Sequence, residues 1–249
     1  MRRGQLSYFF LIGLIIFALF LFAIWALKPR IGPVDYTDPS STKLFIERCI
    51  EDTGRYALFK LGTQGGYITL PLQHAEVAHL PVAYAFNGGN TLPGTPEMAR
   101  ELATFVDGHL TDCIDNGLAA FEERFGKISH QSPKTVAYVQ RDEVRFTVDF
   151  PISISTEQGV LQYDKPYDVS VPVRLGRIHE AIVRMIREYT QTGHLLKLAC
   201  DLEHEFAIRG QSFGPDNLFI LEDTGSVLRN SPDRLDEQYR FFFVIRDRS

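Results

Sequence analysis

The sequence predicts an α+β protein with an N-terminal transmembrane helix, followed by long amphipathic helices packed on an antiparallel sheet. Three observations lead to this prediction. Residues 8–27 contain no charged side chain, and a helix of that length would be about 30 Å long, the thickness of a bilayer's hydrocarbon core. Two later stretches place apolar residues three to four positions apart, as amphipathic helices do. From Pro133 onward the pattern changes to the alternation typical of strands.

The composition is that of a folded domain with an acidic balance of charge. The chain has 249 residues, of which 45% are hydrophobic and 23% charged, and its net charge is −5. Residues 1–29 hold Arg2, Arg3 and Lys28 and no acidic residue, so the rest of the chain is more acidic than the whole. Because phosphate contacts need a basic patch, the sequence argues against a nucleic-acid partner.

Residues 1–29 are predicted to hold a retained single-pass anchor, with its transmembrane helix at about 8–27 and the lipid bilayer as its partner. The apolar run is longer than the h-region of a secretory signal, and no A-x-A-like cleavage site follows it. Basic residues on the two sides of the run nearly balance, so they leave the orientation open. The acidic domain and the cysteines discussed below favour a cytoplasmic N-terminus and a C-terminal domain outside the cell membrane.

The residues before the apolar run are Arg2-Arg3-Gly4-Gln5-Leu6-Ser7, and this segment resembles the start of archaeal prepilin-type proteins. In that family a basic pair and a glycine precede the cleavage site, a glutamine follows it, and an apolar helix comes next. The resemblance implies processing between Gly4 and Gln5. The family pattern has a glutamate where this chain has Phe9, so the resemblance does not extend to the subunit pairing used in filaments. The alternative is a plain basic cap on the anchor.

Residues 30–41 contain prolines and a glycine, and they are predicted to be a linker. The predicted extracytoplasmic α+β domain follows over residues 42–249. Its first helix is expected at about 41–61, with a serine or threonine N-cap and a stop at Gly62.

The segment after this helix is Leu61-Gly62-Thr63-Gln64-Gly65-Gly66-Tyr67-Ile68, and it is similar to a segment of uncharacterised membrane-anchored archaeal proteins. That resemblance implies no particular function. A phosphate-binding loop needs a strand before its glycines and a helix after them. Here a helix comes before and a strand-like stretch comes after, so the glycines predict a helix stop and a tight turn.

The longest helix is predicted over residues 96–125, after an irregular stretch that contains a short strand at 82–86. Its apolar stripe includes Cys113, and the stripe of the first helix includes Cys49. Packing of the two stripes would bring these cysteines together, and a disulfide between them would stabilise the fold by about 3–5 kcal/mol. The alternative is two buried free thiols. The disulfide is favoured because an external domain lies in an oxidising environment.

The C-terminal half is predicted to contain a meander of three to five antiparallel strands, two further helices and a final pair of strands. The last strand is expected to be central in its sheet, because both of its faces are apolar. The predicted ranges are 135–140, 144–150, 160–163 and 167–173 for strands, 177–190 and 194–208 for helices, and 217–222 and 239–246 for the final strands.

No motif in the sequence predicts a reaction. G-x-S-x-G, Walker, G-x-G-x-x-G and C-x-x-C patterns do not occur, and we predict no cofactor, no metal site and no catalytic residue. The leading hypothesis is a membrane-anchored extracytoplasmic protein of structural, adhesive or surface-assembly type. A pilin-like minor subunit is its most specific form, and its partners would be proteins at the cell surface or in the membrane. The alternatives are a membrane-tethered enzyme or solute-binding domain, and an accessory subunit of a membrane complex.

Overall fold

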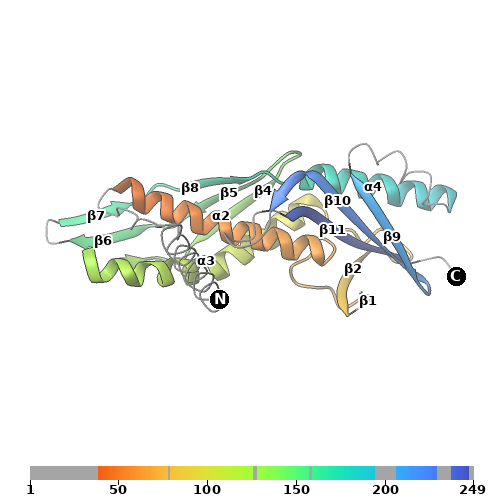
Figure 1. Ribbon diagram of the computed structural model, residues 1–249, viewed down its shortest axis with the longest axis horizontal. Helices are drawn as coiled ribbons and strands as arrows, with labels where there is room; N and C mark the ends of the chain where they lie inside the picture. Colours follow the sequence, from red (N-terminus) through yellow and green to blue (C-terminus); the bar gives the residue numbers. More distant parts are fainter. Residues whose placement is uncertain are drawn as a thin grey trace, which may run out of the picture. The chain divides into compact units, whose positions relative to one another are not determined.

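The computed structural model describes residues 39–77, 79–125, 128–156, 159–193, 206–228 and 237–246. The residues from Thr42 onward form one compact unit, shown in Figure 1. Its described helices are α2 (Pro39–Thr63), α3 (Thr95–Phe125) and α4 (Leu175–Thr192). Its described strands are β1 (His74–Val77), β2 (Leu80–Phe86), β3 (Ile128–His130), β4 (Lys134–Val139), β5 (Val144–Asp149), β6 (Ile152–Thr156), β7 (Gly159–Tyr163), β8 (Tyr167–Val171), β9 (Ala207–Phe213), β10 (Asp216–Leu228) and β11 (Glu237–Arg246).

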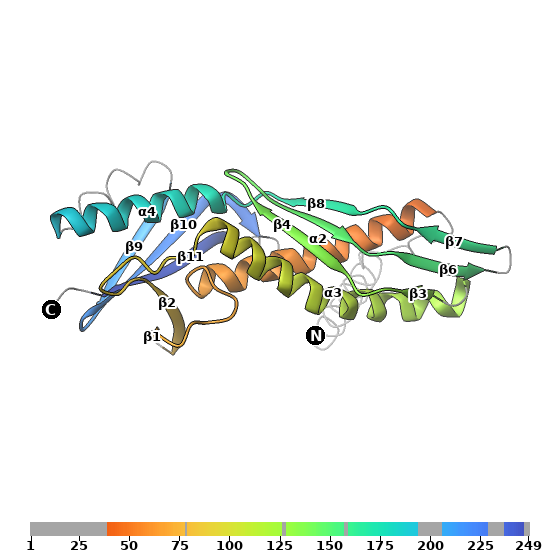
Figure 2. The same cartoon turned by 180° about the vertical axis from the view of Figure 1, so that it is seen from behind.

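The largest sheet has five strands in the order β1-β2-β11-β10-β9. Its pairs are antiparallel except β2 and β11, which run parallel. β11 is central, as predicted, and Phe241 and Phe243 on it are fully buried. α4 lies along this sheet (Figures 1 and 2), where the ring of Tyr189 meets that of Phe86 edge-on at 5.5 Å.

The other two sheets, β4-β5-β8 and β3-β6-β7, are two halves of one antiparallel meander. The two sheets are separated by a short gap between β5 and β6. On both sides of this gap, β5 and β6 pair with β8 and β7 in the same register, since Val148 faces Tyr167 and Ile152 faces Tyr163. On their other edge, β5 pairs with β4 and β6 pairs with β3, and here the register shifts by one residue across the gap. The break falls at Pro151, which has no N–H to donate to a neighbouring strand.

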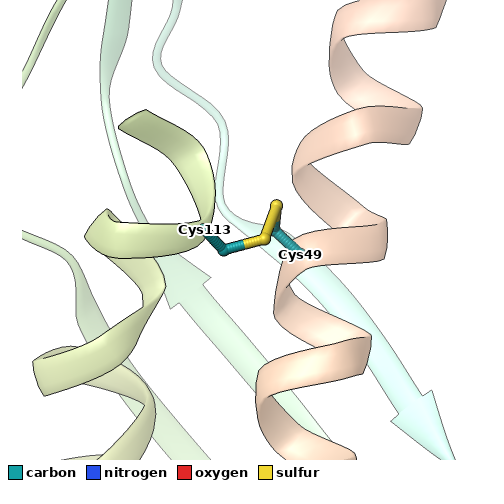
Figure 3. Close-up of a disulfide and its surroundings, with 2 residues drawn as sticks. All are labelled: Cys49 and Cys113. Atoms are coloured by element: carbon teal, nitrogen blue, oxygen red, sulfur yellow. A yellow bond between two sulfur atoms is a disulfide. The ribbon is translucent and has the colours of Figure 1, made fainter. Parts of the chain in front are cut away.

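α2 and α3 pack against each other and are joined by a disulfide between Cys49 and Cys113 (Figure 3), with their Cα atoms 5.8 Å apart. The predicted disulfide is thereby confirmed, and it lies where the apolar residues of the two helices meet. Glycine makes the close approach possible, because a Cβ on Gly117 of α3 would lie 2.1 Å from the Phe45 ring of α2.

The helix boundaries follow local chemistry closely. α2 begins at Pro39, inside the predicted linker 30–41, because proline is favourable in the first turn of a helix. It ends at Thr63, so Gly62 lies inside the helix and the predicted stop at Gly62 is wrong by one residue. Gly65 and Gly66 then take positive φ angles of 79° and 93°, as the predicted tight turn requires. The predicted helix 194–208 lies mostly outside the described residues, and its last two positions belong to β9.

The predicted fold class needs correction in its helices. The α+β class is confirmed, but α2 and α3 are not simple amphipathic helices. Leu44 and Tyr56 on α2 are 64% and 57% exposed, while Gly54 lies on its buried side, where a Cβ would be 2.8 Å from the Phe146 ring. The reason is that α2 contacts α3, the meander and the five-stranded sheet in turn, so its buried face is not one straight stripe.

The fold class also needs correction in its sheet and in its predicted transmembrane helix. One antiparallel sheet was expected, whereas the described chain has three sheets and one parallel pair. None of the described helices is long and apolar enough to cross a membrane, so the predicted transmembrane helix is not part of the fold described here. The stretch 8–27 on which it was predicted, and the predicted processing site at Gly4 and Gln5, lie outside the described residues.

Candidate functional site

A groove lies between the N-terminal half of α3 and strand β4. Its cavity volume is about 570 Å³, which falls in the range of ligand-binding pockets. The strand contributes residues 135–139 to its lining, and Gln140 follows directly after the strand. The helix contributes Thr95, Pro96, Ala99, Arg100 and Ala103.

Small side chains on α3 keep this groove open. Pro96, Ala99 and Ala103 recur three to four residues apart, so they lie on one face of the helix. Asp107 continues the same face one turn later, and its Oδ1 accepts a hydrogen bond of 2.7 Å from the backbone N–H of Thr135. The groove is therefore closed at this end by a carboxylate and open along the alanines.

On the side that faces the groove, the backbone of β4 has no neighbouring strand, since within the described part of the chain β4 pairs with β5 alone. The N–H of Thr135 points to Asp107, whereas that of Gln140 points to the other strand of the hairpin. Successive residues of an antiparallel strand alternate in this direction. The N–H and C=O groups of Ala137 and Val139 therefore point into the groove, as those of Thr135 do.

The side chains of β4 leave this edge unprotected. Val136 and Tyr138 are 51% and 50% exposed, although edge strands are usually protected by charges, prolines or bulges. Edge strand β9, in contrast, exposes polar side chains such as Gln211. β7 also exposes two apolar side chains, Val160 and Leu161, but the groove lies beside β4. An exposed apolar edge next to a groove is typical of a binding surface.

Apart from the groove, a polar cluster lies around Asp223, which is fully buried on β10. The Arg174 guanidinium, just before α4, forms an ion pair with its carboxylate. The hydroxyl of Ser226 and the backbone N–H of Gly225 also donate hydrogen bonds to it. A buried carboxylate surrounded by donors joins the start of α4 to β10, and we assign it a structural role.

The structure brings together two of the residues singled out from the sequence, Cys49 and Cys113, and it joins them in a structural disulfide. Among the described residues, no group of three or more His, Cys, Asp or Glu side chains is arranged to hold a metal ion. Sequence reasoning missed the groove. Its only local signal is the Pro96, Ala99 and Ala103 stripe, which looks like an ordinary helix face until β4 is known to lie beside it.

Comparison of the chain with protein-family models, with curated proteins and with solved structures found no match. The argument for function therefore rests on the groove and on the open edge of β4.

Proposed function

We propose that this protein is an extracytoplasmic binding protein of structural or surface-assembly type, which takes up an extended segment of another protein in the groove between α3 and β4. The observation behind the proposal is the open edge of β4. Ala137 and Val139 present backbone groups to the groove that no described strand pairs with, beside the exposed side chains of Val136 and Tyr138. An extended peptide can add to such an edge as a further strand, through main-chain hydrogen bonds.

The contribution of β4 to binding can be estimated from its backbone groups that face the groove. A strand added about 4.8 Å from β4 would satisfy the N–H and C=O of Ala137 and of Val139. Hydrogen bonds of this kind contribute about 1 kcal/mol each, and burial of the half-exposed Val136 and Tyr138 adds to them. Ordering the segment costs about 2–5 kcal/mol, so the side chains of the bound segment must supply most of the affinity.

The location outside the cytoplasm is part of the proposal. It is supported by the disulfide between Cys49 and Cys113, because such bonds persist in oxidising compartments. An anchor at residues 8–27 and processing after Gly4 remain predictions from the sequence alone. A pilin-like minor subunit would be the most specific form of this function, since assembly subunits hold neighbouring proteins through extended segments.

The test uses the full chain and a phage-displayed library of random peptides. Val139→Pro removes an N–H that points into the groove and leaves the hydrogen bonds to β5 in place. Val139→Ala is the matched control, because it shortens the same side chain and keeps the N–H. We expect selected peptides to bind Val139→Pro at least about tenfold more weakly than Val139→Ala in fluorescence polarisation.

Two results would overturn the proposal. One is a library that yields no enriched peptide over repeated selections. The other is a set of selected peptides that bind Val139→Pro as tightly as the wild type, while thermal unfolding shows that both proteins are folded.

A further inference from the structure

The groove also has chemical features that restrict which segment it can take, and this step rests on the function proposed above. A strand added to β4 alternates its side chains between two faces. One set lies on the side of Val136 and Tyr138. The other set lies on the side of Ala137 and its cross-strand partner Phe146, whose ring faces Gly54 of α2.

The inward side chains of the added strand would enter an apolar space. Ala99 and Ala103 form its wall on α3, and Ala137 and Val139 form its wall on β4. Methyl-sized side chains on the helix leave room that the segment itself must fill, and a polar side chain buried there would lack hydrogen-bond partners. The two inward positions opposite Ala99 and Ala103 therefore favour β-branched or larger apolar residues.

The end of the groove at Thr135 carries an acidic group with unused capacity. Asp107 is half-buried, and its Oδ1 accepts the Thr135 N–H at 2.7 Å. None of the ion pairs found between described residues includes Asp107. A carboxylate can accept several hydrogen bonds, so Asp107 can hold a cation at this end without releasing Thr135.

The net charge of the chain also favours a basic segment. The net charge is −5, and a net negative protein attracts basic ligands at long range. We infer that the groove binds an extended segment of a partner protein with two inward apolar residues, next to a Lys or Arg whose cation pairs with Asp107.

Three synthetic peptides test this inference with the full chain. Their sequences are KTVTVTK, QTVTVTQ and ETVTVTE, each labelled with fluorescein. The valines take the inward positions, and the same residue at both ends makes the strand direction irrelevant. We expect the Lys peptide to bind about threefold to tenfold more tightly than the Gln peptide, a difference of about 0.7–1.4 kcal/mol. The Glu peptide should bind most weakly.

Asp107→Asn is the decisive variant, because its amide oxygen can still accept the Thr135 N–H while the charge is removed. It should no longer prefer the Lys peptide over the Gln peptide, because Arg100 then remains as a cation in the lining of the groove. Asp112→Asn makes the same charge change at an exposed position of α3 and should keep the wild-type preference. Ala103→Leu fills the apolar space and should weaken all three peptides, with thermal unfolding confirming that the protein is folded.

The outcomes separate this inference from the proposed function. If the three peptides bind the wild type equally, or if Asp107→Asn keeps the preference for Lys, the role of Asp107 is wrong while strand binding stands. If none of the three binds, the inferred segment is wrong. The library selection with Val139→Pro then decides the proposed function by itself.

Discussion

Removal of the disulfide between α2 and α3 should cost the protein a large part of its stability. Cys49 and Cys113 are separated by 64 residues. The chain-entropy relation for a loop of that length gives about 14 cal/mol/K, which is about 4 kcal/mol at 25 °C. A protein of this size has about 5–15 kcal/mol of stability in total. The Cys49→Ala/Cys113→Ala double variant should therefore fold, but with its free energy of unfolding lowered by about 4 kcal/mol.

Urea unfolding followed by circular dichroism measures this loss. With an m-value of about 3 kcal/mol/M, the midpoint should fall by about 1.3 M. Dithiothreitol provides the internal control, because it should destabilise the wild type to a similar degree and leave the double variant unchanged. A double variant within about 1 kcal/mol of the wild type would refute the reasoning, as would a wild type that does not respond to the reductant.

Three further predictions concern positions away from the groove, each measured by urea unfolding. Gly62→Ala should lower the free energy of unfolding by about 1–3 kcal/mol, because the new Cβ would lie 2.5 Å from a backbone carbonyl of β11. Gly108→Ala should instead raise it by up to about 1 kcal/mol, because nothing lies within 4 Å of the new Cβ. If Gly108→Ala were the less stable of the two, the packing described here would be contradicted. Asp223→Ala should cost about 3–5 kcal/mol, because it leaves Arg174 without its buried partner, and a loss below 1 kcal/mol would contradict this. The buried Tyr167 hydroxyl has no hydrogen-bond partner among the described residues, and burial raises its pKa to about 12. Because the folded state holds this proton more tightly, the stabilisation should be complete below about pH 10 and should fall between pH 10 and 12. Tyr167→Phe should be at least as stable as the wild type and should lose less stability over that range.

Much of the fold could be predicted because its signals are local. The period of three to four residues located α3, and strand alternation located the β4–β5 hairpin. The pairing of Cys49 with Cys113 followed from the apolar stripe on which each lies, so two local patterns predicted one contact between distant parts of the chain.

The pairing of distant strands could not be predicted in the same way. Nothing in residues 80–86 indicates that β2 lies parallel to β11, because that contact joins segments far apart in the chain. The change of strand register at Pro151 could not be predicted either, since register becomes visible only when both partners are known. The groove was missed for the same reason: Ala99 and Ala103 form a binding wall only because β4 lies beside them with an open edge.

The contacts that hold α3 also predict how the groove responds to loss of the disulfide. Asp107 ties the helix to Thr135, and Glu101 accepts hydrogen bonds from the backbone N–H groups of residues 68 and 69. Glu101 lies between the two alanines of the groove in the sequence of α3 and Asp107 follows them, whereas Cys113 lies farther along the helix. Because these contacts keep the groove preformed, little of the ordering cost of binding should fall on the protein. The Cys49→Ala/Cys113→Ala variant should therefore bind the Lys peptide within about threefold of the wild type, and it should keep the preference over the Gln peptide. A loss of tenfold or more, at a temperature where the variant is folded, would show that the disulfide and not the contacts of Asp107 and Glu101 sets the width of the groove.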